Sequence, residues 1–193
     1  MITKERLLIF FALHNCNLII FEYIYPIFTY IMVTHTLSIS YTEINGKTNL
    51  AVEDKVLLEE AWEACKSAYA PYSNFHVGAA LRLANGLIYK GNNQENAAYP
   101  SGICAERVAI FSASALHPGV AIQAIAVVAK TDTFNIPNPV TPCGACRQVM
   151  AEYESNSGTP IKILLQGNSE KIWILEGITN LLPLMFHGEE LKK

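Results

Sequence analysis

The sequence predicts an α/β fold in which helices cover both faces of a single sheet. The first observation is a set of three helix-like segments, residues 52–70, 104–115 and 143–153. The second is a pair of short, continuously apolar runs that alternate with these helices, as buried strands do. The third is an Asn-Gly pair that joins two strand-like segments as a hairpin. Strands that alternate with helices over two faces predict a three-layer α/β/α sandwich.

The segments before the hairpin predict a strand, a turn and a helix. Residues 36–41 alternate apolar and polar side chains, as a half-buried strand does. Residues 43–49 are polar and contain an Asn-Gly pair, which is typical of a turn or linker. In residues 52–70 the apolar side chains recur at helical spacing, and Pro71 ends that helix.

The hairpin is followed by a loop and a cysteine-bearing helix. Residues 75–83 and 87–90 flank an Asn-Gly pair, which is a strong hairpin signal. Residues 91–102 are polar and predict a loop. The helix at 104–115 then leads to residues 122–129, an apolar run that predicts a buried strand.

The last third of the chain continues the alternation of helices and strands. Residues 131–141 contain two prolines and predict a loop before the helix at 143–153. Residues 161–165 form another apolar run typical of a buried strand, and residues 172–175 predict a further short strand. Residues 178–186 predict a short helical or irregular tail.

Composition limits both the core and the partners of the protein. Of the 193 residues, 51% are apolar, which is enough to bury a sizeable core. The net charge of -3 and the pI of about 5.9 argue against a sequence-independent grip on nucleic acid, which requires a basic face. Five cysteines without regular disulfide spacing predict a reducing compartment, and hence a cytoplasmic protein.

The N-terminus differs in character from the rest of the chain. In residues 7–33 the only charged side chain is that of Glu22, so the run is long enough and apolar enough to span a bilayer. Three interpretations remain open: translation begins at Met32, the run is a signal or membrane anchor, or it is a buried segment. Only the second would give the protein a membrane partner. We therefore divide the chain into an N-terminal extension, residues 1–50, and a main domain, residues 51–193.

Three cysteines and one glutamate carry the chemistry. Cys104 stands two residues before Glu106, and Pro142 precedes the Cys143-x-x-Cys146 pair 39 residues further on. Structural zinc normally has four protein ligands, whereas catalytic zinc has three and leaves one position for water. Glutamate beside the first ligand, followed by Pro-Cys-x-x-Cys, is the pattern of zinc-dependent nucleobase deaminases. The sequence therefore predicts one catalytic Zn²⁺ per chain.

The neighbouring side chains have predicted roles in this chemistry. Glu106 is the expected proton shuttle between water, a ring nitrogen and departing ammonia. Three thiolates would leave Zn²⁺ with a net charge of -1, and we expect Arg107 to offset it by hydrogen bonding to the ligand sulfurs. A redox pair and a closed four-cysteine site are the alternatives, the latter requiring Cys16 or Cys65 as fourth ligand.

Residues 51–193 resemble the small cytidine deaminases of the three-cysteine type. The matching segments extend well beyond the cysteines and comprise residues 72–81, 91–99, 104–107 and 142–148. The resemblance implies a five-stranded mixed sheet and a homotetramer. It also implies that the substrates are cytidine and 2′-deoxycytidine, which are hydrolysed to the uridines in pyrimidine salvage.

The resemblance also implies a set of substrate-binding residues. Asn93 and Glu95 match the pair that holds the ribose hydroxyls, and a carboxylate there would repel a phosphate and so favour a free nucleoside. Phe75 matches an aromatic residue that packs against the base, and Ala105 matches a residue whose backbone faces the pyrimidine edge. Phe186 matches an aromatic residue that closes over the base from a neighbouring subunit.

Three other functions compete with this interpretation. A deaminase of another aminopyrimidine, such as blasticidin S, shares the zinc motif, although the ribose pair Asn93 and Glu95 favours cytidine. A polynucleotide deaminase is disfavoured by the acidic pI. A zinc-stabilised module without enzymatic activity would leave Glu106 as a surface carboxylate and would need a fourth zinc ligand.

Overall fold

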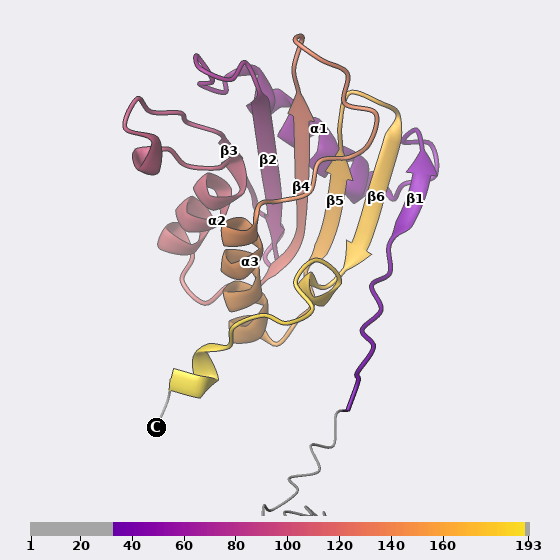
Figure 1. Cartoon of the computed structure of the whole chain (residues 1–193), viewed down its shortest axis with the longest axis vertical. Helices are drawn as coiled ribbons and strands as arrows, with labels where there is room; N and C mark the ends of the chain where they lie inside the picture. Colours follow the sequence, from indigo (N-terminus) through magenta and orange to yellow (C-terminus); the bar gives the residue numbers. More distant parts are fainter. Residues whose placement is uncertain (1–32, 192–193) are drawn as a thin grey trace, which may run out of the picture. The chain divides into compact units, whose positions relative to one another are not determined.

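The structure is a computed structural model that describes residues 33–191, and its helices and strands all lie within the unit Thr36–Lys193. One sheet lies between two helical layers, with α1 on one face and α2 and α3 on the other (Figure 1). The predicted three-layer sandwich is therefore confirmed. Its α-helices are α1 (Val52–Lys66), α2 (Ala105–Leu116) and α3 (Gly144–Ser157), and its 3₁₀ turns are Tyr99–Ser101, Ile178–Asn180 and Gly188–Leu191.

The sheet is mixed and has six strands in the order β1-β6-β5-β4-β2-β3. Only β4 and β5 are parallel, and the other neighbouring pairs are antiparallel. The hairpin predicted at Asn85-Gly86 joins β2 to β3, where Gly86 has a positive φ of 85°. The strands are β1 (Thr42–Asn45), β2 (His76–Leu83), β3 (Ile88–Asn92), β4 (Ile122–Lys130), β5 (Lys162–Gln166) and β6 (Lys171–Glu176).

The sixth strand corrects the expected count of five and comes from the N-terminal extension. The strand predicted at residues 36–41 is extended but unpaired, and the pairing lies at Thr42–Asn45, where we expected the start of a turn. Residues 36–41 have no face to bury, since both Leu37 and Ile39 are 58% exposed. The paired segment instead meets β6, where the indole N–H of Trp173 donates to a Glu43 carboxylate oxygen at 2.7 Å.

Most of the hydrophobic segment at residues 7–33 lies outside the described residues, and so does Cys16. Among residues 33–191, no helix combines the length and the apolarity needed to cross a bilayer.

Two hydrophobic clusters, one on each face of the sheet, fix the helices in place. The cluster under α1 includes Leu57, Leu58 and Cys65, all fully buried. The other cluster lies between the sheet and the helices α2 and α3, and it contains Ala105, Ala109 and Met150. The first turn of α2 is thereby packed directly against the sheet, and this turn carries Glu106 just after the N-cap residue Cys104.

Gly91 permits the close approach of α2 to β3. A Cβ atom at this position would lie 2.4 Å from the Ala105 carbonyl oxygen and 2.6 Å from the Ala109 nitrogen. Both are backbone atoms of α2, so the helix itself would have to move. We expect Gly91→Ala to destabilise the fold by about 1–3 kcal/mol or more, as overpacking does. Thermal unfolding measures this loss, and Gly144→Ala, whose methyl group would enter open space, should cause no comparable loss.

Candidate active site

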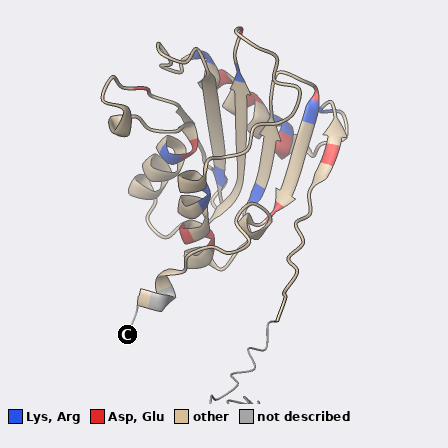
Figure 2. Ribbon diagram, in the orientation of Figure 1, with Lys and Arg blue, Asp and Glu red and all other residues tan. Residues whose placement is uncertain are grey.

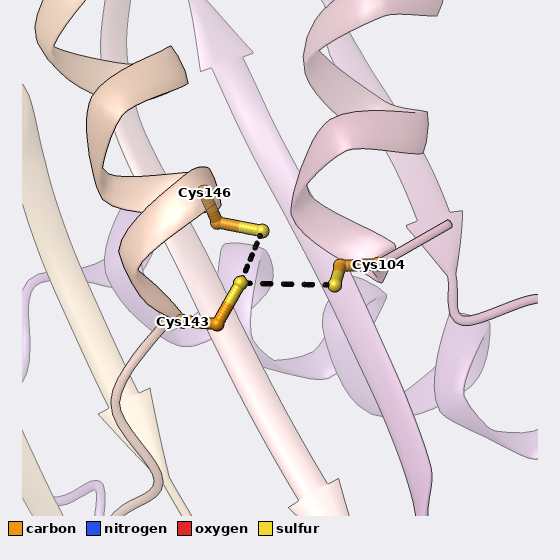
Figure 3. Close-up of side chains that lie close together, drawn as sticks. All are labelled: Cys104, Cys143 and Cys146. Carbon is orange, nitrogen blue, oxygen red and sulfur yellow. Dashed lines mark hydrogen bonds between the residues drawn. The ribbon is translucent and has the colours of Figure 1, made fainter. Parts of the chain in front are cut away.

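The three cysteines of the motif converge at the N-termini of α2 and α3 (Figure 3). Cys104 is the N-cap residue of α2, Cys143 is that of α3, and Cys146 lies in the first turn of α3. The Sγ atoms of Cys104 and Cys143 are 4.0 Å apart, and those of Cys143 and Cys146 are 3.5 Å apart. Two segments separated by 39 residues therefore place three sulfurs within 4.8 Å of one another.

The spacing of these sulfurs fits a tetrahedral zinc ion. With Zn–S bonds of about 2.3 Å, tetrahedral geometry places two ligand sulfurs about 3.8 Å apart. The measured 3.5 Å and 4.0 Å lie on either side of that value. Cys65 is not a fourth ligand, because it is buried under α1 and its thiol donates to the His76 carbonyl at 3.4 Å. Among the described residues the site thus offers three thiol ligands, the number expected for catalytic zinc.

One of the three thiols, that of Cys104, is already biased toward the thiolate form that a metal requires. The pKa of Cys104 is lowered to about 5, first by a hydrogen bond from Cys146 and also by Arg107. The same contact with Cys104 raises the pKa of Cys146, so Cys104 is the thiol of this pair that ionises first. Both N-cap cysteines also lie at the positive end of a helix dipole, which stabilises negative charge on sulfur.

Glu106 is buried in the first turn of α2, with only 4% of its surface exposed. Burial raises the pKa of its carboxyl group to about 7, and the negative charge of Cys104 acts in the same direction. A carboxyl group with this pKa exchanges protons readily near neutral pH, as a general acid and base must.

A pocket of about 730 Å³ opens beside the cysteines. Cys104 and Arg107 line one part of it, and Tyr72, Asn93 and Glu95 line another. Its volume lies within the range of small-molecule sites. Cys104, one of the sequence-predicted metal ligands, and the predicted sugar-binding residues Asn93 and Glu95 come from separate segments and are therefore brought to one cavity.

Comparison with known proteins agrees with this geometry. Residues 51–157 match the model of the cytidine and deoxycytidylate deaminase zinc-binding region. The match covers more than half of the chain. The chain belongs to this family. Its cysteine cluster and Glu106 lie within the matched residues, which the family model describes as a zinc-binding region.

Individual relatives extend the similarity beyond the zinc-binding region. The deaminase is 44% identical to a cytidine deaminase of Sporosarcina psychrophila over 70% of this chain and 92% of that protein. It is 42% identical to a cytidine deaminase of Halalkalibacterium halodurans over 72% of this chain and 98% of that protein. A crystal structure of cytidine deaminase from Burkholderia pseudomallei matches with 43% identity and a TM-score of 0.59, covering 68% of this chain and 98% of that one.

Asn93 and Glu95 of the deaminase are both held rigidly at the pocket. The Asn93 side chain accepts from the Val77 N–H at 2.8 Å and donates to the Phe75 carbonyl at 2.9 Å. The Glu95 carboxylate accepts from the Tyr72 N–H at 2.9 Å, and the Ser73 hydroxyl donates to it as well. These bonds, first that from the Ser73 hydroxyl, lower the pKa of Glu95 and keep it negatively charged. Sequence reasoning missed this support, although residues 72 and 73 belong to a segment that resembles the family.

The other residues predicted to bind substrate lie in different surroundings. Ala105 is fully buried directly after Cys104. Phe75 stacks on Phe134 with the ring centroids 6.1 Å apart, and neither lines the pocket of this chain. Phe186 is 53% exposed in the C-terminal segment, also outside that pocket. A contact between these aromatic rings and a base stays a prediction.

Arg107 lies in the first turn of α2 and contacts the cysteine cluster. Its Nη2 lies 4.0 Å from the Cys104 Sγ, and its buried Nε has no hydrogen-bond partner within residues 33–191. This contact supports the predicted role of Arg107 in offsetting the negative charge of the thiolates.

Loss of the Arg107 guanidinium should weaken the zinc site of the deaminase. We expect Arg107→Gln to lower zinc affinity by about 10–100-fold, the usual effect of removing a group that supports a metal ligand, and to lower turnover. Competition with a chromophoric chelator measures the affinity. Arg82→Gln is the matched control, because Arg82 pairs with Asp54 and donates to the Glu53 carbonyl in α1. Unchanged affinity and turnover in Arg107→Gln would show that the role is wrong.

Proposed function

We propose that the protein is a zinc-dependent cytidine deaminase that hydrolyses cytidine and 2′-deoxycytidine to uridine and 2′-deoxyuridine, with release of ammonia. The observation that carries the proposal is the arrangement of Cys104, Cys143 and Cys146 around one point, with buried Glu106 next to Cys104 and a nucleoside-sized pocket alongside. One Zn²⁺ per chain, held by the three sulfurs, would supply Lewis acidity beside that pocket, where Cys104 lines it.

Glu106 performs the proton transfers of the proposed reaction. Its carboxylate accepts a proton from the attacking water and donates one to the pyrimidine ring nitrogen, which makes the neighbouring carbon electrophilic. It then takes the second proton of the added water from the new hydroxyl group and delivers it to the amino group, which leaves as ammonia as the carbonyl forms. The raised pKa of about 7 suits both directions of transfer near neutral pH.

Asn93 and Glu95 are proposed to bind the sugar. An amide carries two N–H donors and two lone pairs, and the bonds of Asn93 to β2 use one of each. One donor and one acceptor of Asn93 therefore remain for a hydroxyl of the ribose. The negative charge of Glu95 at the same pocket would repel a 5′-phosphate, which favours nucleosides over nucleotides.

Charge and cysteine usage support the predicted partners and location. Lysine and arginine are interspersed with aspartate and glutamate over the described elements (Figure 2), an arrangement that favours a small substrate over a polynucleotide. Cys65 and the three ligand cysteines are free thiols, as expected in a reducing cytoplasm. The relatives are named cytidine deaminases, and pyrimidine salvage is the role we propose for this activity.

Exposed apolar side chains favour the predicted homotetramer. Several large side chains of the described domain are exposed, and an assembly of copies would bury them. They include Tyr99 (92%), Leu184 (83%), Leu116 (65%) and Phe134 (58%). Light scattering of the purified protein measures the assembly, and a mass of one chain would contradict it.

The first test is the ultraviolet absorbance of cytidine incubated with zinc-loaded protein. Loss of the cytidine band would establish the reaction, and 2′-deoxycytidine should behave in the same way. Blasticidin S and a cytosine-containing single-stranded oligonucleotide complete the panel. If the zinc-loaded protein consumes one of these and leaves cytidine unchanged, the proposed substrate is wrong.

A further inference from the structure

Arg147 bonds to two segments of the chain that lie far apart in the sequence. Its Nε donates to the Pro142 carbonyl at 2.7 Å, and its Nη2 donates to the Thr141 hydroxyl at 2.9 Å. Its Nη1 donates to the Leu181 carbonyl at 2.8 Å. Each nitrogen of the guanidinium thus makes one hydrogen bond, and the acceptors belong to two different segments.

The first of these segments carries a metal ligand. Thr141 and Pro142 immediately precede Cys143, and the backbone N–H of Arg147 also bonds to the Cys143 carbonyl at 3.0 Å. Arg147 therefore holds the zinc loop, residues 141–143, through both its side chain and its backbone. The Cys143 side chain itself is exposed and has little packing to restrain it, so these bonds are a principal constraint on its position.

The second segment is the C-terminal segment, residues 181–186, which crosses α3. Leu181 is 9% exposed and belongs to the core cluster under α3. At the other end of this segment, the Gln148 amide donates to the Phe186 carbonyl at 2.8 Å and accepts from its N–H at 3.3 Å. Adjacent residues of α3 thus hold the two ends of the segment, and only Arg147 also bonds to the zinc loop.

We propose that Arg147 is a positioning residue that couples the zinc loop to the C-terminal segment, so that zinc retention and the order of residues 181–186 depend on one side chain. The inference rests on the zinc site of the proposed function. Because a rigid fork of donors fixes both segments at once, displacement of either one strains the bonds to the other. Coupling of this kind is reciprocal, so an ordered C-terminal segment should slow the loss of zinc.

The test compares three zinc-loaded, full-length proteins: wild type, Arg147→Gln and Gln148→Ala. Zinc release into excess chromophoric chelator is timed, and hydrogen exchange is followed in residues 181–186. We expect Arg147→Gln to release zinc about tenfold faster and to exchange faster throughout this segment. Gln148→Ala should exchange faster only near Phe186 and should release zinc within twofold of the wild-type rate.

Two outcomes would overturn the coupling. In the first, Arg147→Gln accelerates only zinc release or only exchange, so that Arg147 serves one segment alone. In the second, neither rate changes while β4 and β5 stay protected. If Arg147→Gln does not fold, the test uses Arg147→Lys instead, which keeps the charge and one donor position. We then expect smaller increases in both the zinc-release rate and the exchange rate. Neither measurement uses a substrate, so its failure is distinguishable from a failure of the proposed deamination.

Discussion

Replacement of Glu106 by glutamine will remove nearly all turnover and leave the zinc site filled. Glutamine has the size of glutamate but cannot accept the proton of the attacking water or return it to the leaving group. General acid–base catalysis contributes about 10²–10⁴-fold, and Glu106 acts in more than one step, so we expect a loss of at least this size. Initial rates on cytidine, with zinc content measured on the same sample, test the expectation.

The control for this variant is Glu63→Gln. Glu63 is an exposed residue of α1 that pairs with Lys66, and its loss should not change the rate. Substantial activity in Glu106→Gln at full zinc occupancy would show that another group moves the protons.

Cys146→Ser will abolish zinc binding and lower stability at the same time. Cys146 is fully buried in the first turn of α3, so its position is fixed by packing, and a hydroxyl group there is a poor replacement for a thiolate. A ligand that binds only the folded state stabilises that state, so added zinc should raise the melting temperature of the wild type and not that of the variant. Metal analysis and thermal unfolding with and without zinc measure both effects.

Cys65→Ala provides the matched comparison, because Cys65 is equally buried but lies under α1 and outside the cluster. It should lose some stability and still bind one zinc per chain. Stoichiometric zinc in Cys146→Ser, with an unchanged response of the melting temperature, would contradict the three-cysteine site.

The sequence sufficed to place the three predicted ligand cysteines at helix N-termini. Cys104 precedes a helix-like segment, and Cys143 follows a proline, so both positions are evident from local patterns. The apolar runs likewise predicted β4 and β5, since buried strands need little tertiary context to be recognised.

Features that depend on distant partners could not be predicted. Residues 36–41 alternate as a strand does, yet β1 begins only at Thr42, directly after them. The strand forms there because that is where the backbone meets the free edge of β6. The hydrogen bonds of Asn93 to β2 and the three acceptors of Arg147 are likewise set by the folded chain. No local sequence pattern predicts these hydrogen bonds, because the partners are distant in the sequence or are backbone atoms, which every residue has.

The direction of β1 determines how the protein can be attached to a surface. The strands β4 and β5 run in parallel, β6 runs against β5, and β1 runs against β6. The chain therefore enters β1 at the end of the sheet opposite the carboxyl end of β4. The loop that follows β4 leads to the Cys143 end of α3 (Figure 1). A bead, electrode or carrier protein joined ahead of Thr42 would thus meet the sheet at the end opposite the loop that leads to Cys143, which suits an immobilised catalyst.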